Sequence, residues 1–276
     1  MQGFSSSFLI LFYQVALGGL FALAGTPFHE IERAFYKSTA SVLYVIALIA
    51  LWGKCALYWQ TLGERFSWSV IAEVFFYVSF VISFSCYMFS LWGEHRVFRA
   101  RSFASSLLTG VAGLVLSSHG FFRSAIFSVE TIIYPMAFLF STLLLGSVTI
   151  GMLIGHWYLI DTGQSLAPFV RIYKFFVITL ILQCVFFVVA PVLLYFLGTS
   201  ETLAGLDRLW QRHGTLVLTR VILGQGAPIL LSWMIWRTLK IPHTMAATGL
   251  FYIALLGVFV GEILGRQILA LTSLPF

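Results

Sequence analysis

The sequence predicts an all-α integral membrane protein: one transmembrane domain over residues 1–276, folded as a bundle of eight transmembrane helices. Two observations support this fold class. The chain is 60% hydrophobic and only 9% charged, which is unusual for a soluble domain. Apolar stretches also recur along the whole chain, each long enough to cross a hydrocarbon core about 30 Å thick. Because this core offers no hydrogen-bond partners, such stretches cross it as helices that satisfy their own backbones.

Eight apolar runs, interrupted by charged residues and by Pro or Gly, define the expected helices. No Lys or Arg precedes Arg33, so the first run lacks the basic leader of a signal peptide and is expected to stay in the membrane. The connections are short and no convincing internal repeat is found, which favours a single domain. The expected helices cover residues 7–25, 38–60, 67–92, 103–119, 131–158, 171–198, 215–236 and 244–268.

The basic residues behind the net charge of +6 gather in the connections between helices, so they indicate topology rather than nucleic-acid binding. Alternate connections differ, with nine Lys or Arg on one side of the membrane and four on the other. Since basic loops stay in the cytoplasm, both termini are predicted to be extracytoplasmic. The nine are Arg33, Lys37, Arg96, Arg99, Arg101, Arg171, Lys174, Arg237 and Lys240, and the four are Arg65, Arg123, Arg208 and Arg212.

The composition leaves no room for a soluble catalytic domain, and the outer surfaces of the helices are expected to contact membrane lipid. Cys55, Cys86 and Cys184 each lie alone in an apolar run. No paired thiol spacing suits zinc, an iron–sulfur cluster or a redox dithiol. We therefore predict no metal site.

Five charged residues lie inside the apolar runs, and the predicted topology puts all five in the outer half of the bilayer. Charges at membrane depth are costly and usually mark a functional site. Three cations and two carboxylates can compensate one another, which favours one polar site. The alternative is that Glu262 and Arg266, four residues apart, form a closed pair that only fixes packing. The five residues are Lys54, Glu73, Arg220, Glu262 and Arg266.

Three short motifs resemble the membrane anchor subunit of dimethyl sulfoxide reductase and, more distantly, the quinone-reactive anchor of the polysulfide reductase type. The last apolar run contains Gly-Glu, two apolar residues and Gly-Arg, from Gly261 to Arg266. The seventh run contains an Arg near its start, Arg220, and the first contains Gln14 followed by Gly18 and Gly19. The resemblance extends loosely over the whole length and implies eight helices with both termini outside.

In that family a His-Leu-Gly tripeptide and a following Glu are associated with quinol oxidation. This sequence has Thr61-Leu62-Gly63 in place of the tripeptide, and Glu73 corresponds to the Glu. The resemblance implies a site for menaquinone or ubiquinone in which Glu73 accepts a proton. The missing His implies a pocket remodelled around Lys54 and Tyr58, with Thr61, Gln14, Arg220, Glu262 and Arg266 also near the quinone.

The resemblance also implies partner subunits, because this chain has no metal cluster with which to pass electrons to a water-soluble acceptor. An iron–sulfur subunit is expected against the outer face, and beyond it a molybdopterin catalytic subunit. The predicted function is that of a quinone-interacting anchor subunit of a respiratory oxidoreductase in the bacterial inner membrane.

A b-type cytochrome is the first alternative. Haem held by two histidines needs both at matching depth on facing helices, and only His156 is clearly at a helix end within the membrane. Possible pairs are His119 with His213, or His156 with His95 or His29. No helix has the buried pairings of a two-haem bundle, which argues against haem.

A transporter is the second alternative, because transporters often have broken helices and internal repeats. Gly224, Gly226 and Pro228 interrupt the seventh run and Pro191 interrupts the sixth. No matching break occurs in the first half, and the predicted polar site lies away from the midplane. These residues, like the glycines of the first and last runs, are expected to serve close packing.

Overall fold

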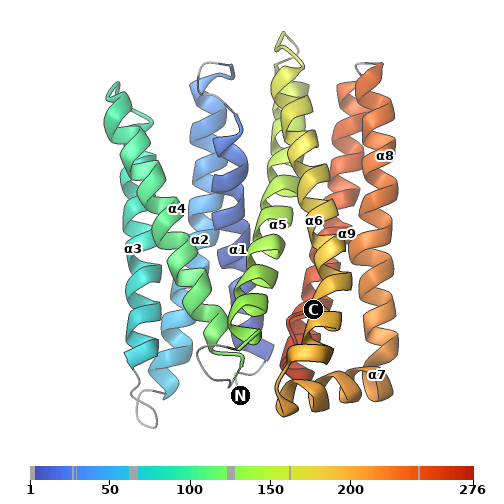
Figure 1. Ribbon diagram of the computed structural model, residues 1–276. Helices are drawn as coiled ribbons and strands as arrows, with labels where there is room; N and C mark the ends of the chain where they lie inside the picture. The colour runs from blue at the N-terminus through green and yellow to red at the C-terminus, as the bar shows by residue number, and fades with distance from the viewer. Residues whose placement is uncertain are drawn as a thin grey trace.

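The computed structural model describes residues 4–26, 28, 30–61, 68–122, 128–161, 163–241 and 243–276, with only the backbone at positions 60 and 61. All regular elements within these residues are helices, and eight helical spans are long and apolar enough to cross a membrane. They stand side by side along a common direction (Figure 1). The all-helical class and the eight candidate spans are thus confirmed, and they support a multi-pass membrane protein.

The helices form two groups of neighbours along the chain. The first group comprises α1 (Phe4–Ala24), α2 (Arg33–Thr61), α3 (Trp68–Ser90) and α4 (Arg96–His119). The second comprises α5 (Glu130–Ile160), α6 (Ala167–Leu197), α7 (Ser200–Val221), the π-helical turn η1 (Ile222–Gly226), α8 (Ala227–Lys240) and α9 (Thr244–Thr272). Together α7, η1 and α8 form the seventh span.

The two groups have equivalent neighbours although the sequence shows no repeat. In the first group α1 packs on α2 and α4, and α3 packs on α4; in the second α5 packs on α6 and α9, and α8 packs on α9. Contacts between the groups are equivalent too, since α1 meets α5, α4 meets α5 and α1 meets α9. Figure 1 shows α1 and α5 in the middle, with α3 and α4 on one side and α8 on the other.

Glycines allow the central crossing of α1 and α5. A Cβ atom added at Gly146 would overlap the backbone of Gly18, and one added at Gly18 would overlap the carbonyl oxygen of Thr142. Small residues at such positions allow helix backbones to approach closely in membranes. The close-packing role predicted for the glycines of the first run is confirmed at Gly18.

The fourth helix begins at Arg96, seven residues before the predicted start at 103. Its first turns are rich in charge, which made them resemble a connection in the sequence. Arg99 instead folds onto the end of α3, where its Nη2 donates to the carbonyl oxygens of Ser90 at 3.1 Å and Gly93 at 2.7 Å. Cations are favourable at the carboxyl end of a helix, so the charged segment is helical and fixes the turn between α3 and α4.

The start of α7 is a helical segment that the apolar-run prediction, 215–236, did not include. It runs across the lower end of the bundle in Figure 1 before the chain turns upward. The turn is at His213, whose φ of −127° and ψ of 21° are not helical. Spacings of three and four residues put small and apolar side chains against the bundle, namely Thr202, Gly205, Leu206 and Leu209. A length criterion missed this segment because only one of its faces is apolar.

Glu130, at the first residue of α5, anchors this segment. Its Oε1 accepts hydrogen bonds from the Thr199 amide at 2.7 Å and the Thr202 hydroxyl at 2.8 Å. A carboxylate is favourable at the amino end of a helix, where backbone amides have no internal partner. The Glu130 side chain therefore stabilises the amino ends of two helices, α5 and α7.

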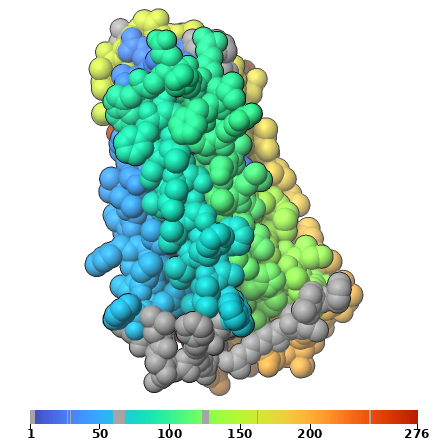
Figure 2. All heavy atoms as spheres, turned by 90° about the vertical axis from the view of Figure 1, so that its left-hand side faces the viewer, coloured from blue at the N-terminus to red at the C-terminus, as the bar shows by residue number. Residues whose placement is uncertain are grey.

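Large apolar side chains point outward from the bundle, as expected for surfaces that contact lipid. Figure 2 looks onto the side formed by α3 and α4, where exposed residues include Phe75, Ile82 and Leu108. On α6 the exposed residues include Ile178, Ile181, Leu182, Val185, Val188 and Val189. The start of α1 and the end of α9 lie toward the same end of the bundle in Figure 1; that this end is extracytoplasmic stays a prediction.

Candidate functional site

The first group of candidate residues surrounds Glu73, in the second turn of α3. Lys54 Nζ, from the last third of α2, lies 2.7 Å from Glu73 Oε1, and the two side chains are 1% and 6% exposed. Ser117 Oγ of α4 donates to Oε1 at 2.5 Å, and the Tyr58 hydroxyl donates a short hydrogen bond to Oε2. Both carboxylate oxygens have partners, as a buried ion pair requires.

Two stacked tyrosines close this group toward the bundle centre. The rings of Tyr77 and Tyr13 lie 4.0 Å apart at 22°, and Lys54 Nζ is 5.7 Å from the centre of the Tyr77 ring. The Tyr77 hydroxyl is 2.9 Å from Ser117 Oγ. Because Ser117 gives its own proton to Glu73, Tyr77 must be the donor to Ser117. Tyr77, Ser117 and Glu73 thus form a directed chain of hydrogen bonds.

Glu73 lies close to one end of the bundle. It follows Trp68, the first residue of α3, by five positions, or about 8 Å at a rise of 1.5 Å per residue. Trp59 and Trp68 are 80% and 83% exposed on the two helices, as is typical of aromatic residues at a membrane interface. Thr61 ends α2, but its side chain and the rest of its predicted tripeptide lie outside the described residues.

The second group surrounds Glu262 on α9, which is 2% exposed. Arg220 Nη2 of α7 lies 3.3 Å from Oε1, and Arg266 Nη2 lies 3.5 Å from Oε2. Gln183 Nε2 of α6 donates to Oε1 at 2.6 Å, and Ser141 of α5 donates to Oε2. The predicted pair of Glu262 with Arg266 therefore exists, but it belongs to a network that joins four helices.

Glycines make room for the arginines. A Cβ atom at Gly265 would meet the Arg220 guanidinium, and one at Gly261 would overlap Gly224 in η1. Arg220 Nη1 also donates to the Gly261 carbonyl oxygen. The role predicted for Gly261 and Gly265 in close packing is confirmed, and it brings α7 and α9 near enough for their charged side chains to meet.

A chain of amides extends the second group into the π-helical turn. Gln225, one of the buried residues of η1, donates through Nε2 to Gln183 Oε1 at 3.3 Å and accepts from Cys184 Sγ at 3.0 Å. Because a π-helical turn shifts the register of a helix, it often occurs at functional positions. Here it directs a polar side chain of the seventh span toward α6.

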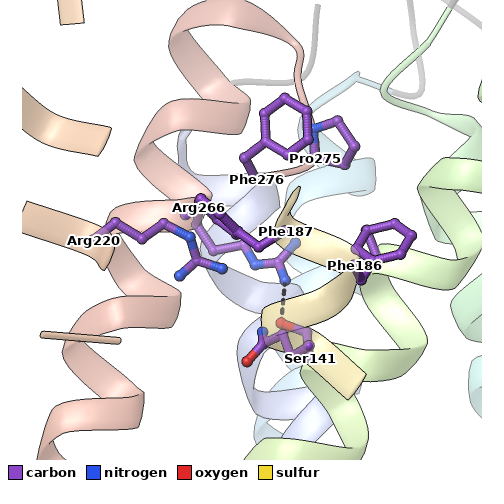
Figure 3. Close-up of a pocket in the computed structure, with 10 residues that line it drawn as sticks. Ser141, Phe186, Phe187, Arg220, Arg266, Pro275 and Phe276 are labelled. Atoms are coloured by element: carbon purple, nitrogen blue, oxygen red, sulfur yellow. Dashed lines mark hydrogen bonds between the residues drawn. The ribbon is translucent and has the colours of Figure 1, made fainter. Parts of the chain in front are cut away.

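A small cavity of about 20 Å³ lies beside this network (Figure 3). Arg220 and Arg266 extend toward each other there, and Arg266 Nη2 donates to Ser141 Oγ at 3.2 Å. Both arginines are buried, and the Nε atom of each has no hydrogen-bond partner. The lining residues are Ala137, Ser141, Gln183, Phe186, Phe187, Arg220, Gly265, Arg266, Pro275 and Phe276.

The five intramembrane charges, which we predicted to form one polar site, are held in two groups. Lys54 pairs with Glu73 among α2, α3 and α4, whereas Glu262 and its arginines join α5, α6, α7 and α9. The central contact of α1 with α5 lies between these sets of helices (Figure 1). The prediction of a single cluster needs this correction because a sequence gives the depth of a residue in the membrane but not the direction in which it points.

Gln14 lies at the central contact rather than in either ion-pair group. It is fully buried, and its Nε2 donates to the Phe138 carbonyl oxygen of α5 at 2.8 Å. The ring of Phe138 in turn lies 4.5 Å from the Arg266 guanidinium carbon. The contacts of Gln14 therefore connect α1 to the second group through the backbone of α5.

Sequence reasoning missed several polar partners of the two carboxylates. Serines are common in membrane helices, so Ser117 and Ser141 carried no distinctive signal. Gln183 did carry one, because a lone amide within an apolar run needs a hydrogen-bond partner from another helix. Tyr77 occupies a helix position typical of an ordinary core residue. Its hydrogen bond to Ser117 depends on the packing of α4 against α3.

Among the described residues, no group of three or more His, Cys, Asp or Glu is arranged to hold a metal ion. His156 Nδ1 lies 3.2 Å from the Tyr252 hydroxyl of α9. This contact gives His156 a hydrogen-bond partner at the end of α5.

Comparison of the chain with protein-family models and with curated proteins gave no match. The resemblance to quinone-reactive anchor subunits therefore stays a prediction that depends on the motifs of the first, seventh and eighth spans.

Proposed function

We propose that this chain is a quinone-interacting membrane anchor subunit of a bacterial respiratory oxidoreductase, and that the quinone headgroup binds beside Lys54 and Glu73. The observation that carries the proposal is a buried carboxylate surrounded by hydrogen-bond donors near one end of the bundle. The motif resemblance supplies the class of substrate, and the arrangement around Glu73 supplies a chemical role.

Oxidation of a quinol releases two protons and two electrons, so its site needs a base for a hydroxyl proton. Glu73 suits this role, since a quinol hydroxyl can replace the Tyr58 hydroxyl at Oε2 and transfer its proton there. The second proton goes to water at the same end of the bundle. The two electrons would pass one at a time to iron–sulfur centres of a partner subunit, and the product is the quinone.

Lys54 and Ser117 control the carboxylate in this proposal. The Lys54 ammonium pairs with the ionised carboxylate of Glu73, which is the form able to accept a proton. Protonation leaves Lys54 uncompensated at 1% exposure, and a buried unpaired charge is costly. In this proposal the proton passes from Glu73 to water at the same end of the bundle, which prepares the site for another quinol.

The second group is assigned a different role. A cavity of about 20 Å³ is far smaller than the several hundred Å³ typical of pockets for organic ligands. Arg220, Glu262 and Arg266 are therefore proposed to hold α5, α6, α7 and α9 together. This narrows the predicted quinone-binding set to Lys54, Tyr58 and Glu73 among the described side chains.

Co-purification and turnover test the proposal. The tagged chain, expressed from its native locus, should bring with it subunits that carry iron–sulfur and molybdopterin cofactors. With menadiol or decylubiquinol as electron donor, Glu73→Gln should reduce turnover of that complex at least roughly a hundredfold, the usual contribution of a general base. Glu130→Gln is the matched control, because Glu130 is a buried carboxylate that binds the start of α7.

The control should assemble and retain most of its quinol-dependent turnover. Full turnover by the Glu73→Gln complex would remove Glu73 as the base. Purification of the chain without any cofactor-bearing partner would refute the anchor function itself.

The equivalent neighbours of the two helix groups favour a transporter as the second candidate, because some transporters consist of two parallel repeats. The π-helical break at Ile222–Gly226 interrupts the seventh span, whereas its counterpart α3 is continuous from Trp68 to Ser90. This difference weakens the comparison with a repeat transporter. Purification as a single chain that carries a solute across vesicle membranes would support transport instead.

A further inference from the structure

The outward side of α8 is apolar along its length and basic at its end. Ile229, Trp233, Trp236 and Lys240 follow one another at spacings of four, three and four residues, so they share one helix face. All four are exposed, and so is Arg237, one turn after Trp233. The two cations lie where α8 ends, at the end of the bundle opposite to the start of α1 (Figure 1).

Each of these cations lies over a tryptophan ring one turn earlier in the helix. Lys240 Nζ is 3.7 Å from the centre of the Trp236 ring, and Arg237 Cζ is 5.8 Å from the centre of the Trp233 ring. An aromatic ring attracts a cation at such distances, but it has no net charge with which to neutralise it. The rings therefore hold the two positive charges close to each other on an exposed face.

No carboxylate compensates these cations among the described residues. The ion pairs formed there involve other side chains, and the sequence has no Asp or Glu between Asp207 and Glu262. The neighbouring α6 has none either. The Tyr173 hydroxyl of α6 donates to the Ser232 carbonyl oxygen of α8 at 3.1 Å, and the next residue, Lys174, is exposed and adds a further positive charge near this face.

Other basic side chains predicted to lie on this side of the membrane have carboxylates close by. Arg171 pairs with Glu30 at 2.9 Å. Lys37 lies over the Trp92 ring at 5.1 Å, but the exposed Glu94 follows Trp92 by two positions. The face of α8 differs from both places because its two cations have aromatic partners without a nearby negative charge.

We propose that this face of α8 binds one anionic phospholipid, with the phosphate at Arg237 and Lys240 and an acyl chain along Trp233, Trp236 and Ile229. Phosphate oxygens accept charge-assisted hydrogen bonds from both cations. A zwitterionic lipid carries its own ammonium group, which these cations repel. The predicted topology puts the lipid in the cytoplasmic leaflet, where anionic headgroups attract basic residues near the membrane surface.

The apolar part of the face selects a lipid rather than a free phosphate ion. Ile229, Trp233 and Trp236 are 50%, 55% and 40% exposed, and an acyl chain covers such side chains whereas an inorganic ion does not. The headgroup and the chain therefore bind to adjoining parts of one helix face. Aromatic residues at the membrane interface suit this arrangement, since their rings lie at the level where headgroups meet acyl chains.

Native mass spectrometry of the purified chain, or of its complex, in a neutral detergent tests this site. Stepwise addition of phosphatidylglycerol should give one tightly bound lipid per chain. Its affinity should exceed that of phosphatidylcholine with the same acyl chains by roughly thirtyfold, about fivefold for each cation. Inorganic phosphate at the same concentration should not displace it.

Arg237→Gln combined with Lys240→Gln removes both cations and should lower the affinity for phosphatidylglycerol to that for phosphatidylcholine. Arg96→Gln combined with Arg101→Gln is the matched control, because these are two exposed basic residues of α4, predicted on the same side of the membrane. The control should bind phosphatidylglycerol as wild type does. All four side chains are exposed, so neither change removes a packed group.

Four results overturn the proposal. Equal affinity of the wild-type chain for the two lipids is the first, and this comparison needs no variant. An equal loss of affinity in the two double variants would mean that binding reflects the total charge on this side of the protein. Displacement of the lipid by inorganic phosphate would mean a simple anion site. A mass of two chains without bound lipid would mean that the face is an interface between copies.

Discussion

Replacement of Lys54 by Met tests whether the Lys54–Glu73 pair is a true buried ion pair. Methionine is unbranched and flexible like the lysine stem, so it can fill the same space without the charge. Glu73 then stays in place with its two hydroxyl donors, Ser117 and Tyr58, but without its cation. The perturbation therefore isolates the charge rather than the packing.

The expected loss of stability in Lys54→Met follows from the burial of the Lys54–Glu73 pair. Removal of one partner from a buried ion pair costs about 3–5 kcal/mol in the free energy of unfolding. Two hydroxyl donors still stabilise the carboxylate, so we expect about 3 kcal/mol, at the lower end of this range. In the double variant Lys54→Met with Glu73→Gln no charge remains buried, and the loss should shrink to about 1 kcal/mol.

Equilibrium unfolding in mixed micelles, titrated with sodium dodecyl sulfate, measures these differences. Arg171→Met is the matched control, because Arg171 also pairs with a carboxylate, that of Glu30 at 2.9 Å, but the side chains are 42% and 25% exposed. Water compensates the partner left behind in such a pair. Its variant should lose much less stability than Lys54→Met.

The reasoning fails if Lys54→Met costs no more than Arg171→Met. It also fails if the double variant loses the sum of the two single losses, because additivity means that the two charges do not depend on each other. Either result would mean that the Lys54–Glu73 pair does not behave as a buried ion pair, and the pairing would lose its physical argument.

Two more predictions concern packing and topology. Gly146→Leu should destabilise the fold by about 3 kcal/mol or more in the same assay, because overpacking typically costs about 1–3 kcal/mol and the added side chain would overlap the backbone of Gly18. Gly249→Leu, where an added Cβ has no atom within 4 Å, should be nearly neutral. Equal losses in the two variants would refute the close crossing of α1 and α5. The predicted topology is tested in a chain whose three native cysteines have been replaced. In that background Arg208→Cys should react with a membrane-impermeant maleimide on intact cells, whereas Lys240→Cys should react only after lysis. The reverse pattern would mean that the topology is inverted.

The number of spans could be predicted from the sequence because it depends on the length of apolar runs, and a bilayer sets that length. The predicted positions of the helix ends were less accurate than the predicted number of spans. Charged turns such as that of Arg96 stay helical when a neighbouring helix end accepts their side chains. The start of α7 was missed because its stability comes from one packed face and from the distant Glu130.

The candidate site was predictable in part. Glu73 and Glu262 were identified because ionisable groups within apolar runs are rare and need partners. The identity of those partners was not predictable, since it depends on the rotation of each helix about its axis. A residue's position along a helix does not reveal that rotation until neighbouring helices are packed.

The sequence by itself determined the helical class, the eight candidate spans and the presence of five charges that cannot remain unpaired in hydrocarbon. Only the tertiary structure decided that Lys54 pairs with Glu73 while two arginines share Glu262, and that a small cavity lies beside these arginines. The reason is physical. The hydrophobicity of each segment acts separately and can be calculated from the sequence of that segment alone, whereas ion pairs and cavities depend on how helices far apart in the sequence pack together.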